Sequence, residues 1–167
     1  MGERPMNGST ENRASDAFEK SDKPEIAYNL GTARRMVTLV RRIVDDVMRL
    51  KRQLAVLSPE QSRLDREKRT LAWPQRQRRY ELHEDLGSLE HQFRDALAEL
   101  EVLGVALLVP SEGLVGLPTV VNGRLAYFSW KPSEESLRFW HFPGESIRRP
   151  IPASWKEFGE IRTQVKT

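Results

Sequence analysis

Cysteine is absent from this chain of 167 residues. Without it the chain can form no disulfide, use no thiolate in catalysis and build none of the common cysteine-ligated zinc sites. Long apolar runs are missing too, since no stretch approaches the roughly 18 residues that span a bilayer. The first residues also lack the apolar stretch of a secretory signal. We therefore expect a cytoplasmic protein that does not associate with membranes.

Charge and apolar content are both moderate. Apolar residues make up 38% of the chain and charged residues 31%, which suits one domain with a small core. The net charge of +3 falls short of the basic footprint of a dedicated nucleic-acid-binding protein. The composition predicts a disordered polar tail over 1–27, a helical hairpin over 28–104, a small sheet packed with it as one domain over 105–155, and a C-terminal tail over 156–167.

Apolar residues that repeat at alternating spacings of four and three predict a first long helix. They are Met36, Val40, Ile43, Val47, Leu50, Leu54 and Leu57. The sequence LSPEQ then predicts that this helix stops and that another starts at once. Ser58 can accept hydrogen bonds from the first free amides, Pro59 suits the first helical position, and Gln61 completes a capping box.

The same spacing predicts a second helix further along the chain. Its apolar positions are Leu82, Leu86, Leu89, Phe93, Ala96, Leu100 and Leu103. Gly104 is expected to end it as a C-cap, and the short connection predicts that the helices fold back antiparallel. Leu64 and Leu71, which precede this pattern, do not fit its spacing of four and three. Trp73 and Pro74 should kink or restart the helix, so the number of helices there stays open.

The first helix carries more apolar surface than one partner helix can cover. The surplus residues are Val37, Leu39, Val44 and Met48. The sheet could cover them within one chain, or a second copy could do so by forming a four-helix bundle across a twofold axis. We expect a homodimer, because a hairpin of this length outreaches a small sheet.

After Gly104 the period shortens and predicts an antiparallel sheet of three or four strands. VALLV is one strand, and GLPTVVNGRLAYFSW is a hairpin that turns at Asn122 and Gly123 in a type I′ turn. In the strand SLRFWHF, alternation predicts Leu137, Phe139 and His141 on one face and Arg138, Trp140 and Phe142 on the other. RRPIPASW should lie across the sheet, anchored by Ile151 and Trp155. The predicted fold class is α+β, a long antiparallel coiled-coil-like hairpin followed by a small antiparallel sheet.

Several short sequences in this part of the chain form an ordered succession. They are LGV at 103–105, GLVGLP at 113–118, NGRLAYFSW at 122–130, Glu134, WH at 140–141 and RRPI at 148–151. With the helical hairpin before them, they resemble the bacterial family called domain of unknown function 2203, over about 28–151. The family tends to have an acidic residue where this chain has Gly116 and a cysteine where it has Ser129.

That family has no assigned activity, so the resemblance implies domain limits and marks positions without supplying a mechanism. The marked positions, which we take as candidate motif or ligand-binding residues, are Arg124, Trp130, Glu134, Trp140, His141, Arg148 and Arg149.

The candidate site on the sheet depends mainly on His141, whose side chain titrates near neutrality. Glu134 with Arg148 or Arg149 could hold this imidazole, or hold an anionic ligand beside it. A small enzyme or anion sensor would follow. In the alternative, His141 bonds a neighbouring carbonyl and the aromatic residues around it simply build the core.

Metal and cofactor sites are not expected. His83 and His91 lie eight residues apart, about 12 Å along a helix, which is too far to share one ion. No motif for a nucleophile, a phosphate-binding glycine loop or a zinc protease occurs in the sequence.

Charge is divided along the second helical region. Positions 63–79 hold seven basic and two acidic residues, while 83–101 hold six acidic residues and one arginine. A basic end on the hairpin could contact phosphate groups or RNA, and the candidate residues are Arg69, Arg76, Arg78 and Arg79. The alternative is a solvated helical face with pairs such as Asp65 and Arg69. We expect a binding or scaffold protein that acts through its hairpin, as a homodimer or with a protein partner, rather than an enzyme.

Overall fold

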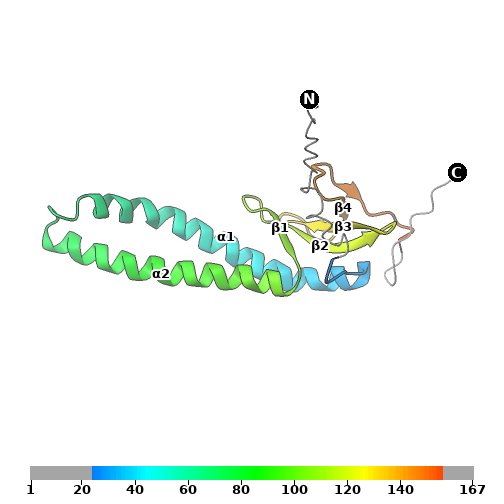
Figure 1. The fold of residues 1–167 in the computed structure, drawn as a ribbon, viewed down its shortest axis with the longest axis horizontal. Helices are drawn as coiled ribbons and strands as arrows, with labels where there is room; N and C mark the ends of the chain where they lie inside the picture. Colours follow the sequence, from blue (N-terminus) through cyan, green and yellow to red (C-terminus); the bar gives the residue numbers. More distant parts are fainter. Residues whose placement is uncertain (1–23, 156–167) are drawn as a thin grey trace, which may run out of the picture.

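The computed structural model describes residues 24–155 and shows a long helical hairpin that extends away from a small twisted sheet (Figure 1). Its elements are α1 (Leu30–Arg66), α2 (Trp73–Val102), β1 (Ala106–Val109), β2 (Leu114–Val121), β3 (Arg124–Trp130), β4 (Phe139–His141) and β5 (Arg149–Pro150). The predicted fold class is confirmed. Residues 1–23 and 156–167, which hold most of the two predicted tails, lie outside the described residues.

Helix α1 begins at a cap formed by Asn29, whose side chain accepts a hydrogen bond from the Thr32 amide at 2.8 Å. It then runs through Pro59, so the prediction that it stops at Ser58 is wrong. The Ser58 hydroxyl donates to the Leu54 carbonyl at 2.6 Å instead of capping a new helix. Pro59 is exposed, so water can reach the carbonyl that a proline leaves unbonded, and continuing the helix buries Leu64.

The bend of the hairpin lies at 67–72, and α2 restarts at Trp73 with Pro74 in its first turn. Leu71, in the bend itself, packs with Leu64 and Leu82 in a small separate cluster. Leu71 is therefore outside both helices, and no heptad phase applies to it. Leu64 continues the spacing of the first helix.

The two predicted apolar seams face each other. Val40, Val47 and Leu50 of α1 and Leu82 and Leu100 of α2 are all buried, and these helices make the most extensive contact between elements. Helix α2 ends as predicted, because Gly104 adopts a φ of 69° and the next amide bonds back to the Leu100 carbonyl at 2.9 Å. Neither described helix is long and apolar enough to cross a membrane.

The five strands lie in sequence order, each antiparallel to the next. Asn122 and Gly123 join β2 to β3 with φ values of 51° and 74°, the positive pair that the predicted turn requires. The fifth strand is an addition to the prediction. Arg149 and Pro150 pair with β4 at the edge of the sheet instead of lying across it, which is where a strand tolerates proline.

The sheet covers one side of the hairpin near its open end. Val37 and Val44 are buried in one core with Phe128 and Trp130, and Met48 packs at its margin. The sheet therefore covers three of the four surplus apolar residues of α1 within one chain. Leu39, the fourth, remains 45% exposed.

The face prediction for the fourth strand holds only in part. Trp140 lies in the core with Phe128, its register partner, while His141 pairs with Tyr127. Leu137, which we predicted beside His141, is instead buried in the same core as Trp140. Strand β4 is only three residues long, so its alternation does not extend back to Leu137. Trp155 serves as the predicted anchor, because its ring lies 4.9 Å from that of Trp140.

Candidate functional site

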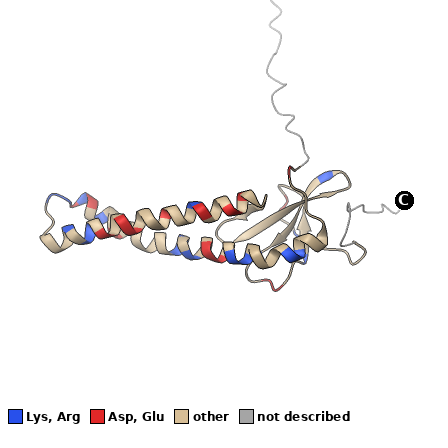
Figure 2. Ribbon diagram, turned by 90° about the horizontal axis from the view of Figure 1, so that it is seen from below, with Lys and Arg blue, Asp and Glu red and all other residues tan. Residues whose placement is uncertain are grey.

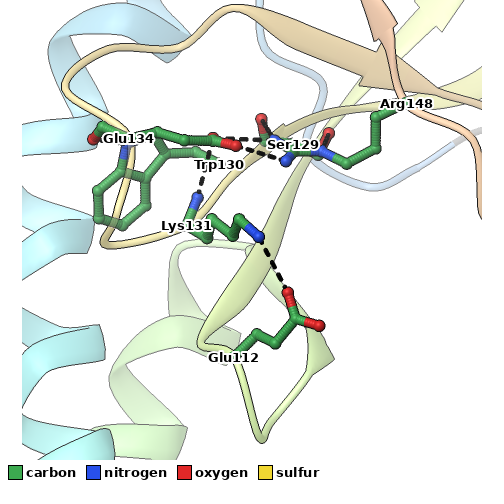
Figure 3. Close-up of polar contacts among 6 residues, drawn as sticks. All are labelled: Glu112, Ser129, Trp130, Lys131, Glu134 and Arg148. Atoms are coloured by element: carbon green, nitrogen blue, oxygen red, sulfur yellow. Dashed lines mark hydrogen bonds and ion pairs between the residues drawn. The ribbon is translucent and has the colours of Figure 1, made fainter.

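An ion pair between Glu134 and Arg148 is the centre of the candidate site on the sheet (Figure 3). Glu134 lies in the turn after β3, and Arg148 immediately precedes β5. The two terminal nitrogens of Arg148 donate to the two carboxylate oxygens at 2.5 and 2.9 Å. Arg148 also donates to the hydroxyl of Ser129 at 2.9 Å and to its carbonyl at 2.7 Å. All three guanidinium nitrogens thus bond within the chain.

The same turn is attached to α1 through Arg41. Trp130 donates from its indole nitrogen to the Glu134 carbonyl at 3.0 Å, and Arg41 donates to that carbonyl at 3.0 Å. The Arg41 guanidinium lies 4.6 Å from the centre of the Trp130 ring. Glu134 further accepts from the Lys131 amide at 3.2 Å. The predicted residues Trp130, Glu134 and Arg148 therefore meet in one network that joins sheet and hairpin.

Arg41 and Ser129 were not among the predicted site residues. The sequence carries one signal for Arg41, because it continues the surplus apolar stripe of α1 at spacings of four and three between Val37 and Val44. A charged residue inside an apolar stripe needs a buried or half-buried polar partner. The buried Ser129 is marked only by the resemblance, as the position within NGRLAYFSW where the family tends to have cysteine.

His141 lies near this network without joining it. Its side chain is only 5% exposed, and its ring centre lies 5.9 Å from that of Tyr127. The Nδ1 atom has no hydrogen-bond partner in the part of the chain that the structure describes. Burial first, and the positive charge of Arg148 second, lower the pKa of His141 below its usual value. The arrangement thus favours a neutral imidazole that bonds neither Glu134 nor Arg148.

The remaining predicted residues of the sheet gather around Phe142. The guanidinium of Arg124 lies 4.6 Å from the centre of this ring, and that of Arg149 lies 5.9 Å from it. The Trp140 ring meets the same side chain edge-on at 5.2 Å. Arg149 also forms an ion pair with Glu145. The hydrogen bonds that the Glu145 carboxylate accepts from Arg149 and from the Phe142 amide lower its pKa to about 2. Each of these cations therefore already has an aromatic or acidic neighbour.

Gly116 and Ser129, where the sequence departs from the resembled family, are neighbours across β2 and β3. A Cβ atom at Gly116 would lie 2.8 Å from Tyr127 and 2.9 Å from Leu108, both side-chain contacts. The tyrosine ring and the leucine occupy the space that a side chain at 116 would need. The described residues hold no group of three side chains suited to a metal ion.

At the far end of the hairpin, two of the four predicted phosphate-binding arginines are paired with carboxylates. Arg78 bonds both oxygens of Glu60 at 3.2 Å, and Arg79 bonds Asp65 at 2.5 Å. Asp65 thus pairs with Arg79 across the hairpin rather than with Arg69, which lies in the bend beyond the end of α1. Its pKa falls because of that bond.

The other two arginines at this end differ in their contacts. Arg76 donates to the Leu71 carbonyl at 3.0 Å, and Arg69 is exposed. Figure 2 shows basic residues near the bend and acidic residues along the half of α2 nearer the sheet.

A groove between α1 and α2, close to the sheet, was not predicted. It is lined by Leu39, Ile43, Asp95, Ala98, Glu99 and Val102. Val102 is 78% exposed and Leu39 45% exposed. The groove therefore presents apolar side chains beside two carboxylates on the outer surface of the hairpin.

Comparison with known proteins gives one match. No curated protein and no solved structure matches this sequence. The model of a family described as an uncharacterized conserved protein matches residues 27–151, which include the hairpin and all five strands. The chain therefore belongs to the family of domain of unknown function 2203 (DUF2203).

Proposed function

We propose that this chain is a scaffold protein that associates with itself through the outer surface of its helical hairpin. The observation that carries the proposal is the groove beside the sheet, where Leu39 and Val102 expose apolar side chains. Burying a valine or leucine side chain in an interface contributes about 1.5–3 kcal/mol. A second copy that covers both residues on each side of a twofold axis buries four such side chains, with a smaller gain for the half-buried Leu39 than for Val102.

The contacts of the sheet support a binding protein over an enzyme. Glu134 and Arg148 bond each other and neighbouring main-chain atoms, so neither is held ready for a substrate. His141 is the remaining titratable group of the predicted cluster, and it lacks a general acid or base bonded to it. The network instead fixes the turn after β3 against α1.

The experiment compares two exposed apolar residues that are each changed to aspartate. Val102→Asp places a charge in the groove, and Ile147→Asp makes the same kind of change in the segment between β4 and β5, where Ile147 is 73% exposed. We expect Val102→Asp to weaken self-association, measured by sedimentation velocity, by at least about tenfold, because an unpaired charge would have to be buried. Ile147→Asp should associate like the wild type.

Two results would contradict the proposal. One is equal association of the wild type and Val102→Asp. The other is an equal loss of association in both variants, which would place the contact elsewhere. Circular dichroism checks that both variants keep the helical content of the wild type.

A further inference from the structure

The outward side of α2 carries a line of aromatic, small and apolar residues. Its members are Trp73, Tyr80, Gly87, Ala98 and Val102. At about 3.6 residues per turn, their spacings bring all five to nearly the same side of the helix. Trp73 is 70% exposed and Tyr80 64% exposed. The line runs the length of α2, from the bend to the groove beside the sheet.

The two ends of this line are flanked by opposite charges. The exposed residues Lys68, Arg69 and Arg76 lie near its start, while positions 83–101 hold six acidic residues and one arginine. Figure 2 shows basic residues near the bend and acidic residues along the half of α2 nearer the sheet. If a second α2 lay parallel to the first, like charges would face each other. If it lay antiparallel, the basic start of one helix would face the acidic end of the other.

We propose that the occupant of the groove is the bend end of a second copy of this chain, with the two α2 helices antiparallel about a twofold axis near Gly87 and Ser88. Trp73 of the second copy then lies against Val102 and Leu39. The inference rests on the proposed function, since it specifies how the copies associate.

Three pairs of residues on α2 have their midpoints beside Ser88, and the two members of each pair lie on the same flank of the line. In the antiparallel dimer Trp73 would meet Val102, Arg76 would meet Glu101, and Glu84 would meet His91. All six side chains lie on exposed positions of α2.

Nothing lies within 4 Å of where a Cβ atom at Gly87 would stand. The centre of the line is therefore open, and a glycine there lets two helices approach closely. An antiparallel pairing about this point satisfies the apolar and the charged positions at the same time.

Charge reversal tests the pairing of Arg76 with Glu101. We expect Arg76→Glu alone and Glu101→Arg alone each to raise the dimer dissociation constant by about tenfold, because symmetry repeats the contact and each change replaces an attraction with a repulsion. The double variant, with both changes in one chain, should recover the wild-type constant. A double variant as weak as either single variant would overturn the antiparallel arrangement.

Cross-linking tests the position of the axis directly, because the chain has no cysteine of its own. Gly87→Cys should form a disulfide-linked or short-maleimide-linked dimer, since the two copies of position 87 lie beside the axis. Lys68→Cys is the control on the exposed bend. In the antiparallel dimer the two copies of position 68 lie tens of Å apart, because each is many residues from the twofold axis and a helix rises about 1.5 Å per residue. They should therefore not cross-link. Cross-linking at both 68 and 87 would show a parallel arrangement, and an absence of cross-linking at 87 would place the axis elsewhere. Either result would overturn the inference.

The outcomes separate this inference from the proposed function. If Val102→Asp weakens association while neither the charge reversal nor the cross-links behave as expected, the hairpin associates but the antiparallel pairing is wrong. If the wild type remains monomeric, the proposed function fails and the inference fails with it.

Discussion

Arg148 binds both carboxylate oxygens of Glu134, at 2.5 and 2.9 Å, although the two residues lie in different segments on either side of β4. Their side chains are only 18% and 15% exposed. Ser129 of β3 completes the contact. The pair thus ties the turn after β3 to the chain that enters the edge strand, and its first effect is on stability.

Removing one member of this pair should strongly destabilise the fold. We expect Arg148→Ala or Glu134→Ala to lower the free energy of unfolding by about 3 kcal/mol, because each leaves a mostly buried partner charge uncompensated. Arg148→Lys should cost less than Arg148→Ala, since it keeps the charge but loses the two-pronged contact. Urea denaturation followed by circular dichroism measures all three. Variants that unfold with the wild-type midpoint would show that the pair contributes little.

Arg41 should control the mobility of the turn after β3. It donates to the carbonyls of Pro132, Glu134 and Glu135 at 3.3, 3.0 and 3.4 Å. Arg41→Met keeps the apolar stem and removes these donors, which should cost about 1–3 kcal/mol. We expect faster amide hydrogen exchange at 131–135 in this variant, with exchange in the distal half of the hairpin unchanged. Exchange that stays as slow as in the wild type would remove Arg41 from this role.

The burial of His141 predicts a dependence of stability on pH. Its pKa is lowered in the folded state by burial and by Arg148, so the unfolded chain binds the proton more readily. The contribution of the neutral imidazole is therefore complete above the usual pKa near 6.5 and is lost as the pH falls below it. We expect His141→Asn to reduce the loss of stability between about pH 6.5 and 5.

His83→Asn is the control for that measurement, because His83 lies at an exposed position of α2 and takes no part in the proposed dimer contacts. Urea midpoints at several pH values compare the two variants with the wild type. Equal pH dependence in His141→Asn and the wild type would contradict the predicted direction of the pKa change.

We expect any side chain at Gly116 to lower the stability of the fold. A Cβ atom there would approach Tyr127 and Leu108 within 3.0 Å, so these side chains would have to move. We expect Gly116→Ala to lower stability by about 1–3 kcal/mol. Gly87→Ala, made on the open surface of α2 and measured at low concentration, should instead raise it by about 0.5–1 kcal/mol through helix propensity. A Gly116→Ala variant that melts no lower than the wild type would show that the sheet has room at this position.

The helices and the β2–β3 turn could be predicted from sequence because each depends on local rules. The spacing of Val40, Ile43 and Val47 predicts the apolar face of a helix without knowledge of the rest of the chain. Asn122 and Gly123 by themselves predict the turn between two strands. The end of α1 could not be predicted in the same way. The local capping signal at Ser58 is overridden by burial of Leu64 against residues across the bend, a tertiary effect that no local pattern contains.

The sequence could predict which residues belong to the candidate site, but not which bonds they form. Glu134 and Arg148 were marked by the succession of motifs, but their spacing could not show that they bond each other and Ser129. The sequence could not predict the groove, because Leu39 and Val102 belong to different helices and become neighbours only when the hairpin forms. The surplus apolar residues of α1 suggested a covered surface, and the sheet covers most of it.

The mass of the wild-type chain in solution, measured by sedimentation equilibrium over a range of concentrations, tests the central claim most directly. Association through the hairpin predicts a mass that rises with concentration from 19.3 kDa toward twice that value and is lowered again by Val102→Asp. A mass that stays at 19.3 kDa throughout the micromolar range, for the wild type as for the variant, would contradict the proposed function.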